Sequence, residues 1–273
     1  MLKNYLFKNL NDYRAYLNDH PFHEIFNINV NNLKEINSKL DYEPFRSVDP
    51  KNDIPLEPEI DDLTRLHYLI TSRKVSTILE FGVGSSTLVF NEALDYNKTN
   101  YSNYFSENLR RSNAFECYSI DNSKKWIEHT KKQHDFNNVI FHYTGCEVST
   151  FNGRVCTFYN NLPNICPDFI YIDAPDQFSV GGDIRGISTR HKDRLPMSAD
   201  VLSIEHFLLP GTLIVLDGRT ANARFLEKNL QRNWEYFHSE EFDQHFFELK
   251  EKPLGPYNKK QIEFCLGADW MSY

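Results

Sequence analysis

The segment TILEFGVGSSTLVF, residues 77–90, combines a carboxylate with a glycine-rich turn between a predicted buried strand and a predicted helix. Gly82 and Gly84 allow a tight turn and let a ligand come close to the backbone, which a side chain at either position would hinder. Three short hydroxylated residues that open and can cap the helix follow: Ser85, Ser86 and Thr87. A plain connection between strand and helix also uses glycine, so the neighbouring residues must decide whether this turn binds a ligand.

Charge beside the turn restricts the kind of ligand. Glu80 places a carboxylate where it would repel the pyrophosphate of a dinucleotide, whereas it would suit a ligand with a positive charge. The next predicted strand ends in Asp121, followed by Asn122, and the carboxylate of Asp121 can accept two hydrogen bonds from a ribose diol. Alternatively, Asp121 caps the helix that follows it.

These residues resemble the class I S-adenosylmethionine-dependent methyltransferases. S-adenosylmethionine has an ammonium group, a sulfonium and a ribose, and it has no phosphate. The resemblance covers residues 67 to about 250 and implies that the glycine turn contacts the methionine part of the cofactor, that the acid after the second strand holds the ribose, and that Glu147 lies near the adenine. The cofactor-binding residues implied in this way are Glu80, Gly82, Gly84, Ser85, Ser86, Thr87, Asp121, Asn122, Glu147 and Asp173.

Two further predicted strands end in aspartates, Asp173 and Asp217. Both would lie where a methyl donor and an acceptor meet, and two carboxylates there are candidates to hold a divalent cation, as in the metal-dependent O-methyltransferases related to the catechol enzyme. That family has Asp-Asn at the second position. This chain has Asp217-Gly218, which leaves Asn222 as a substitute ligand. Alternatively, Asp217 caps the next helix, and Asp173 acts as the base that deprotonates an acceptor hydroxyl.

A long polar segment, residues 176–196, follows the strand that ends in Asp173. Its cations outnumber its aspartates by one in an otherwise acidic chain, which favours an anionic acceptor such as a phosphorylated or carboxylated sugar. The candidate substrate-binding residues are Arg185, Arg190 and Arg194, and His191 is a candidate general base. A solvated charged loop is the alternative interpretation.

Strands and helices alternate along the chain from residue 61 onward. Strands are predicted at 75–82, 116–122, 138–145, 167–175, 211–218, 234–240 and 244–250, and helices at 61–73, 86–96, 124–134, 197–209 and 220–231. The pattern predicts an α/β fold with a doubly wound, mostly parallel, seven-stranded sheet and a C-terminal antiparallel hairpin. Ligands of such sheets bind beyond the carboxyl ends of the strands.

Two segments stand apart from this alternation. Residues 1–66 are predicted to form a helical and irregular extension, and residues 67–273 the methyltransferase-like domain. Residues 95–113 are rich in Asn, Ser and Tyr and are predicted to be an inserted polar loop, which explains the long separation between Glu80 and Asp121. The segment after the last strand, LGPYNKKQ, is predicted to be a turn.

Composition narrows the partners and the compartment. The formal net charge is −8 over 273 residues, which does not favour binding to nucleic acid phosphates. The five cysteines have no close C-x-x-C pair, so free thiols are expected. There is no signal-peptide core and no stretch of ~20 apolar residues, so a cytoplasmic protein that does not cross a membrane is expected.

Three functions are compatible with these features. The first is an S-adenosylmethionine-dependent methyltransferase, most simply an O-methyltransferase acting on a small hydroxylated molecule. The second is an NAD- or nucleotide-sugar-dependent oxidoreductase with a degenerate dinucleotide turn, which Glu80 disfavours. The third is a non-catalytic methyltransferase-like subunit that docks through its N-terminal extension.

Overall fold

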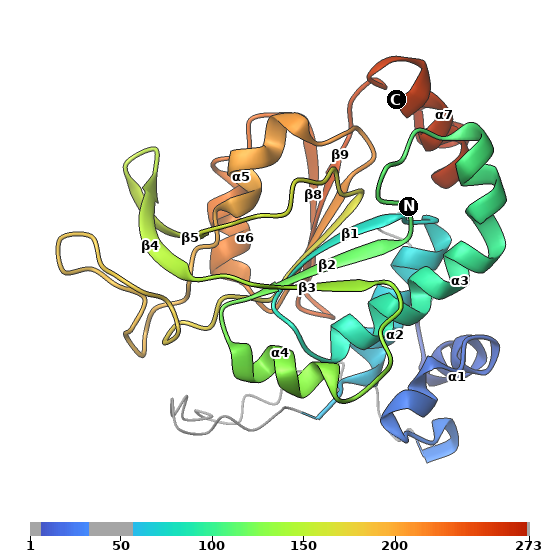
Figure 1. Ribbon diagram of the computed structural model, residues 1–273, viewed down its shortest axis with the longest axis horizontal. Helices are drawn as coiled ribbons and strands as arrows, with labels where there is room; N and C mark the ends of the chain where they lie inside the picture. Colours follow the sequence, from blue (N-terminus) through green and yellow to red (C-terminus); the bar gives the residue numbers. More distant parts are fainter. Residues whose placement is uncertain (1–6, 33–56, 272–273) are drawn as a thin grey trace.

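A seven-stranded sheet forms the centre of the molecule in the computed structural model, which describes residues 7–32 and 57–271 (Figure 1). The strand order is β3-β2-β1-β6-β7-β9-β8, and β9 runs antiparallel to both of its neighbours. The strands are β1 (Thr77–Phe81), β2 (Glu116–Asp121), β3 (Val139–Tyr143), β6 (Phe169–Ile172), β7 (Leu213–Asp217), β8 (Trp234–Ser239) and β9 (Gln244–Leu249). The predicted fold class, with its terminal antiparallel hairpin, is therefore confirmed.

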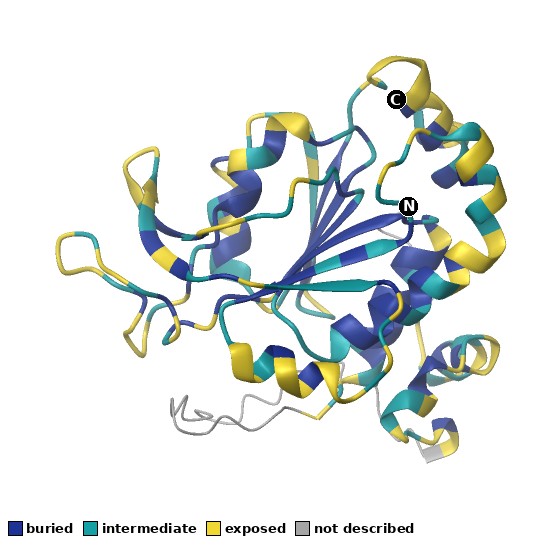
Figure 2. Cartoon of the chain, in the orientation of Figure 1, coloured by how far each residue is buried: buried dark blue, intermediate teal, exposed yellow. Residues whose placement is uncertain are grey.

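Strands at the middle of the sheet are buried on both faces, as Figure 2 shows. Every residue of β1, β6 and β9 is buried, and the sequence of β6, FIYI, is accordingly a continuous apolar run. Side chains alternate between two hydrophobic cores. Leu79 and Phe81 pack into one core, and Ile78 packs into the other.

Helices cover both faces of the sheet (Figure 1). They are α1 (Leu10–Asp19), α2 (Ile60–Ser72), α3 (Ser85–Asn108), α4 (Lys124–Lys131), α5 (Asp200–Ile204), α6 (Thr220–Glu227) and α7 (Gly255–Cys265), with 3-10 turns at Phe22–Phe26, Val30–Asn32, Glu205–Phe207 and Ala268–Met271. Residues of α2 and α3 share one core with the sheet, and residues of α5 and α6 share the other. No helix within the described residues combines the length and the apolar character of a membrane span.

Helix α3 corrects the prediction of a polar loop at 95–113, because it continues to Asn108. The buried amide of Asn97 donates to the carbonyls of Ile70 (3.0 Å) and Val75 (2.9 Å), and the ring of Tyr104 stacks on Phe264. Tertiary contacts thus keep an Asn- and Ser-rich segment helical despite its modest intrinsic propensity. The inserted residues therefore lengthen α3, which packs against α7 through Tyr104 and Phe264.

Two elements were not predicted. Residues 146–159 form a separate hairpin of β4 (Cys146–Phe151) and β5 (Arg154–Tyr159), which projects from the sheet in Figure 1. The segment predicted as a turn after β9 begins α7 instead, with Pro256 in its first turn, where proline is favourable. Proline and glycine were therefore misread as a turn signal when they start a helix.

The N-terminal part docks on the main domain through aromatic contacts. The Tyr16 hydroxyl of α1 lies 2.7 Å from Nδ1 of His67 in α2, and the ring of Phe22 stacks on the same imidazole. Helix α2 spans Ile60–Ser72, so it crosses the domain boundary predicted at residue 66. Residues 33–56 of the predicted extension, which include most of its prolines, lie outside the described residues.

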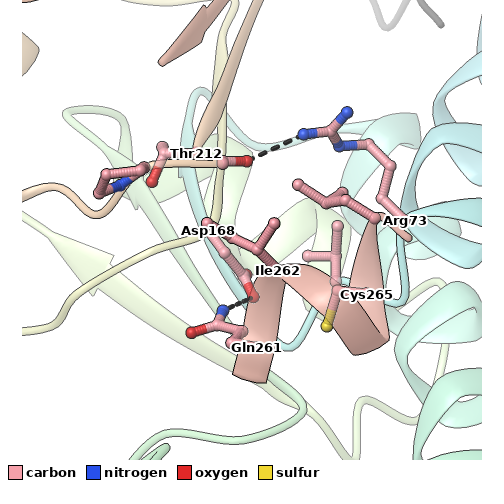
Figure 3. A pocket seen from close by; sticks show the side chains of 10 residues that line it. Arg73, Asp168, Thr212, Gln261, Ile262 and Cys265 are labelled. Carbon is pink, nitrogen blue, oxygen red and sulfur yellow. Dashed lines mark hydrogen bonds between the residues drawn. The ribbon is translucent and has the colours of Figure 1, made fainter. Parts of the chain in front are cut away.

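A small cavity lies at the amino ends of the strands, as Figure 3 shows. Its volume is about 20 Å³, room for about one water molecule. Arg73 donates to the carbonyl of Gly211 (2.9 Å) and Gln261 donates to Asp168 (3.4 Å), so the cavity is a packing gap between α2, α7 and the sheet. The predicted site residues lie at the opposite ends of the strands, which are their carboxyl ends.

A buried polar cluster joins the hairpin to α5 and α6. The Asp200 carboxylate accepts hydrogen bonds from the Tyr159 backbone (2.9 Å) and the Ser198 hydroxyl (3.2 Å). The amide of Asn222 bonds to both the N–H and the C=O of Ser198. Burial raises the pKa of Asp200 to about 7, and these hydrogen bonds lower it only in part.

We expect the raised pKa of Asp200 to make the free energy of unfolding fall as pH rises. The folded chain keeps the Asp200 proton up to about pH 7, whereas the unfolded chain loses it near pH 4, so folding takes up a proton between these values. The free energy of unfolding should fall by about 1.4 kcal/mol per pH unit from this group within that window. Urea unfolding at a series of pH values measures this effect. In Asp200→Asn, the free energy of unfolding should fall less steeply with pH than in the wild type. Equal pH dependence in the two proteins would contradict the assignment.

Candidate functional site

The four strand ends that carry the predicted acids lie side by side. Strands β2, β1, β6 and β7 are consecutive and parallel in the sheet, and Phe81 is paired with both Ile120 and Ile172. Their carboxyl ends therefore bring the first turn, Asp121, Asp173 and Asp217 to one edge of the molecule. The topology assembles the residues that the sequence predicted, which lie as far as 137 positions apart between Glu80 and Asp217.

Glu80 is fully buried, and its carboxylate accepts hydrogen bonds from three hydroxyl groups. Ser86 (2.6 Å) and Thr87 (2.8 Å) donate from the first turn of α3, and Ser119 (2.5 Å) donates from the position opposite Glu80 on β2. The side chain thus points beneath the start of α3, on the face of the sheet that α2 and α3 cover. Ser86 and Thr87, predicted to contact the cofactor, bond to Glu80.

Burial raises the pKa of Glu80 to about 7, although the three hydroxyls lower it in part. Near neutral pH the group is therefore balanced between its carboxyl and carboxylate forms. A positive charge placed beside the turn would favour the carboxylate, and a phosphate would favour the carboxyl.

The two glycines of the turn have different structural roles. Gly82 has a φ of +99°, and a Cβ there would come within 3.0 Å of the Cβ of Ala174 and 3.3 Å of the carbonyl carbon of Asp173. The first turn can therefore pack against the end of β6 because this residue has no side chain. Gly84 has an extended backbone, and a Cβ there would meet nothing within 4 Å. Gly84 leaves open space directly before α3.

Asp121 joins two turns of the site. One of its carboxylate oxygens accepts from the Val83 backbone (3.1 Å) in the first turn, and the other accepts from the Ser123 backbone (2.6 Å) after β2. Ser123 caps α4 with its own side chain, so the capping role considered for Asp121 belongs to its neighbour. Burial raises the pKa of Asp121. Asn122 donates to Ser179 in the loop that follows β6.

Asp173 is the most accessible of these acids, with 57% of its side chain exposed. Its Oδ1 lies 3.4 Å from Nε of Arg219, and the same guanidinium donates to the carbonyls of Asp173 (2.7 Å) and Pro175 (3.2 Å). Arg219 follows β7, whereas Asp173 follows β6, so this arginine ties two strand ends together. Arg219 was not among the predicted site residues, because nothing in its local sequence shows that its side chain reaches across to β6.

Asp217 is paired with Gln244 of β9. Burial and the nearby charge of Asp173 raise the pKa of Asp217 to about 7. Gln244 also accepts a hydrogen bond from Arg65 (3.3 Å), a buried residue of α2 that forms ion pairs with Asp61 and Asp62. The alternative role of Asp217, capping α6, is not observed, since the residue before α6 is Arg219 and it makes no side-chain cap.

The residues around Asp173 and Asp217 do not fit the predicted divalent cation. Asn222, the substitute ligand, is buried and uses its amide on the backbone of Ser198. Gly218 offers no side chain, and the guanidinium of Arg219 already brings a positive charge to Asp173. Among the described residues, the group of three side chains with converging ligand atoms is instead His238, Asp243 and His245.

The loop of residues 176–196 packs along the β4–β5 hairpin. Gly181 exchanges backbone hydrogen bonds with Cys146 and Val148, and it is bridged to Glu147, whose exposed carboxylate accepts from Asn160 (3.4 Å). Loop and hairpin together form one lobe, defined here as residues 146–159 and 176–196, which Figure 1 shows projecting from the sheet. Glu147 lies on this lobe.

The predicted substrate-binding cations are also on this lobe. Arg185 and Arg190 are exposed, and Arg194 is half-buried and donates to the carbonyl of Ser188 (2.9 Å). His191 is exposed and accepts from the Asp193 backbone (3.2 Å). Within residues 7–32 and 57–271, no hydrogen bond or ion pair links His191 to the acids at the strand ends.

Tyr159 is a second residue of the site that was not predicted from the sequence. It ends β5, its ring packs on Phe81, and its buried hydroxyl has no hydrogen-bond partner among the described residues. Burial raises the pKa of this hydroxyl, and the charge of Asp121 raises it further. A buried donor without a partner is uncommon and offers a contact to a bound molecule.

Comparison with known proteins gives only distant likenesses. No protein-family model matches the chain, and no curated protein matches it in sequence. Among solved structures, the chain is similar to the methyltransferase PaMTH1 of Podospora anserina bound to SAH, with 13% identity and a TM-score of 0.38 over 72% of this chain and 80% of that one. It is also similar to the O-methyltransferase TomG of Streptomyces achromogenes in complex with SAM, with 12% identity and a TM-score of 0.35 over 86% and 88% of the two chains. Likeness at this level does not assign an activity.

The two glycines should respond differently to alanine. Gly82→Ala forces a side chain into a left-handed backbone and against Ala174, so we expect it to lower the free energy of unfolding by about 1–3 kcal/mol. Gly84→Ala meets open space and should change stability by less than about 1 kcal/mol. Urea unfolding measures both, and equal losses would show that Gly84 is also constrained by packing.

Proposed function

We propose that the chain is an S-adenosylmethionine-dependent O-methyltransferase that acts on a small hydroxylated acceptor. One observation carries this proposal: the first turn lies between two acids, Glu80 and Asp121, whose hydrogen-bond donors are all neutral hydroxyl or backbone groups. Such a turn disfavours a pyrophosphate and favours a cationic adenosine compound. The open space at Gly84 gives the ligand access to the backbone.

A dinucleotide-dependent oxidoreductase is the weaker candidate. The doubly wound dinucleotide fold has a parallel sheet and needs its first turn free of negative charge for the pyrophosphate. Here β9 runs antiparallel between β7 and β8, and the turn is acidic. A non-catalytic role is disfavoured by Asp173, because 57% of its side chain is exposed at the edge of the site although its carboxylate pairs with Arg219.

Each residue of the site has a place in the proposed chemistry. The cofactor, when bound, supplies an electrophilic methyl group on a sulfonium. Asp121 and Asn122 would hold the ribose, and Gly82 and Gly84 would let the methionine part approach the backbone. Tyr159 offers a further hydroxyl to the bound molecule. In this arrangement the protein mainly aligns the reacting groups and removes one proton from the acceptor.

Asp173 is the better of the two candidate bases. Its backbone N–H donates to Phe81 (2.9 Å), and its carbonyl carbon lies next to Gly82, so its side chain starts directly beside the cofactor turn. Surrounding protein raises the pKa of its carboxyl above the usual range, which makes the carboxylate a stronger base, while Arg219 lowers it in part. His191 is on the outer lobe and is oriented by its neighbour Asp193.

Arg219 takes over the electrostatic role that a metal ion has in the metal-dependent relatives named above. Its guanidinium is permanently charged and is fixed by two backbone carbonyls, so it can stabilise negative charge on an acceptor oxygen beside Asp173. The exposed cations Arg185 and Arg190 support an acceptor that is itself anionic, such as an acidic saccharide or its precursor. The chemistry of the site therefore needs no added Mg²⁺.

Cofactor binding should be linked to a proton at Glu80. A cation bound beside the turn favours the carboxylate, so S-adenosylmethionine should release a fraction of a proton near pH 7 and should bind more tightly at pH 8 than at pH 6. Calorimetry in buffers of different ionisation enthalpy measures this release. Glu80→Gln keeps the size and shape of the side chain but cannot ionise, so it should remove the part of the pH dependence that comes from Glu80, and NAD should give no heat with either protein. Binding of NAD in preference to S-adenosylmethionine would refute the proposed function.

Removal of the base should affect turnover and leave cofactor binding intact. Asp173→Asn should lower kcat by about 10²–10⁴ and should change the Kd for S-adenosylmethionine much less, because the variant removes the proton acceptor and keeps a side chain of the same shape beside Arg219. His191→Asn is the matched control, since it removes the other candidate base from the exposed lobe, and it should keep most of the activity. Methyl gain by an acceptor, followed by mass in buffer without Mg²⁺, measures both; loss of activity in His191→Asn alone would reverse the assignment.

A further inference from the structure

Two histidines and an aspartate meet at the turn between β8 and β9. His238 and His245 are directly opposite each other in the antiparallel pair, and their ring centroids are 3.9 Å apart. Asp243 is the last residue of the turn, and its Oδ1 lies 3.7 Å from Nε2 of His238. Each of the three residues offers a ligand atom within 4.8 Å of the others.

The spacing of these atoms is close to that of metal ligands. Nitrogen and oxygen ligands at about 2.1 Å from a tetrahedral ion lie about 3.4 Å from each other. The 3.7 Å between His238 and Asp243 is too long for a hydrogen bond, and a shift of a few tenths of an ångström would close it around an ion. Nε2 of His238 is shielded from water and has no hydrogen-bond partner among the described residues, which is costly for a polar atom. A cation would satisfy it.

His245 is fully buried, and each of its two ring nitrogens lies close to a hydroxyl group. The Tyr236 hydroxyl lies 2.9 Å from Nδ1 and orients the ring, as outer partners of metal-bound histidines do. Nε2 lies 3.0 Å from the hydroxyl of Thr220, which would give up this contact to an ion.

We propose that His238, Asp243 and His245 form a binding site for a late first-row divalent cation, represented by Zn²⁺, with water as the fourth ligand. Two imidazoles and one carboxylate suit Zn²⁺ better than Mg²⁺ or Ca²⁺, which prefer oxygen ligands. The rings are stacked with an interplanar angle of 14°, so one ring must turn to direct its nitrogen at the ion. His238 is free to do so because 28% of its side chain is exposed.

The ion would stabilise the edge of the candidate active site. Gly218 donates its backbone N–H to the carbonyl of Asp243 (2.8 Å). The β7–α6 loop, which also carries Arg219, is therefore hydrogen-bonded directly to one of the three proposed ligands. The site is separate from Asp173 and Asp217 and would fix the position of Arg219 without taking part in methyl transfer.

Zn²⁺ titration of the tag-free full-length chain tests the site. After chelator treatment and its removal, calorimetry with Zn²⁺ should show one site per chain, and Co²⁺ should give the visible bands of a tetrahedral complex. His238→Ala and Asp243→Asn should each lower the Zn²⁺ affinity by more than the ~10–100-fold that loss of an outer partner costs. Two independent variants keep the test valid if one of them folds poorly.

His134→Ala is the matched control. His134 also has 28% of its side chain exposed and also pairs with one carboxylate, that of Glu92, but it lies outside the cluster. Both His134→Ala and Asp173→Asn should bind Zn²⁺ with the same affinity as the wild type. Absence of saturable binding, equal affinity in wild type and His238→Ala, or loss of binding in Asp173→Asn would each overturn the proposal.

Discussion

The hydrogen bonds that bury Glu80 are the constraint on which the rest of the site depends. They join the end of β1, the adjacent position of β2 and the first turn of α3 through Ser119, Ser86 and Thr87. A buried carboxylate without such donors would be strongly destabilising, so these positions need hydroxyl side chains. The arrangement fixes the path of the glycine turn and places an ionisable carboxyl group beneath it. The geometry of the turn therefore comes from one set of contacts.

Charge at the carboxyl edge is balanced by a residue from a neighbouring strand end. Glu80, Asp121, Asp173 and Asp217 gather there because their strands are parallel and adjacent, and desolvation by the surrounding protein raises the pKa of each. Arg219 compensates part of this charge and ties the end of β6 to the start of α6. A metal ion would supply charge at the same place, but Gly218 and the occupied amide of Asn222 leave it too few ligands.

Two elements outside the central strands flank the site: the lobe of residues 146–159 and 176–196, and the β8–β9 turn. The β4–β5 hairpin and the loop of residues 176–196 pair through Gly181 and form a lobe that carries exposed arginines. At the other end of the sheet, the β8–β9 turn rests against the loop after β7 through Gly218 and Asp243. The central sheet thus positions the four acids at the strand ends, while the lobe and the β8–β9 turn flank them.

Local sequence alone determined the central strands, the glycine turn and the acids at the strand ends, because burial on both faces demands continuous apolar runs and because parallel topology puts functional residues where those runs end. The helical extension of α3, the hairpin and α7 depended on contacts between distant segments, such as Asn97 with Val75 and Tyr104 with Phe264. The roles of single side chains were decided by tertiary structure as well. Sequence places Glu80 beside the turn, but only folding shows that its carboxylate points under α3 toward Ser119, and that Arg219 reaches Asp173. Side-chain partners across a sheet are set by register and packing, which have no local signature.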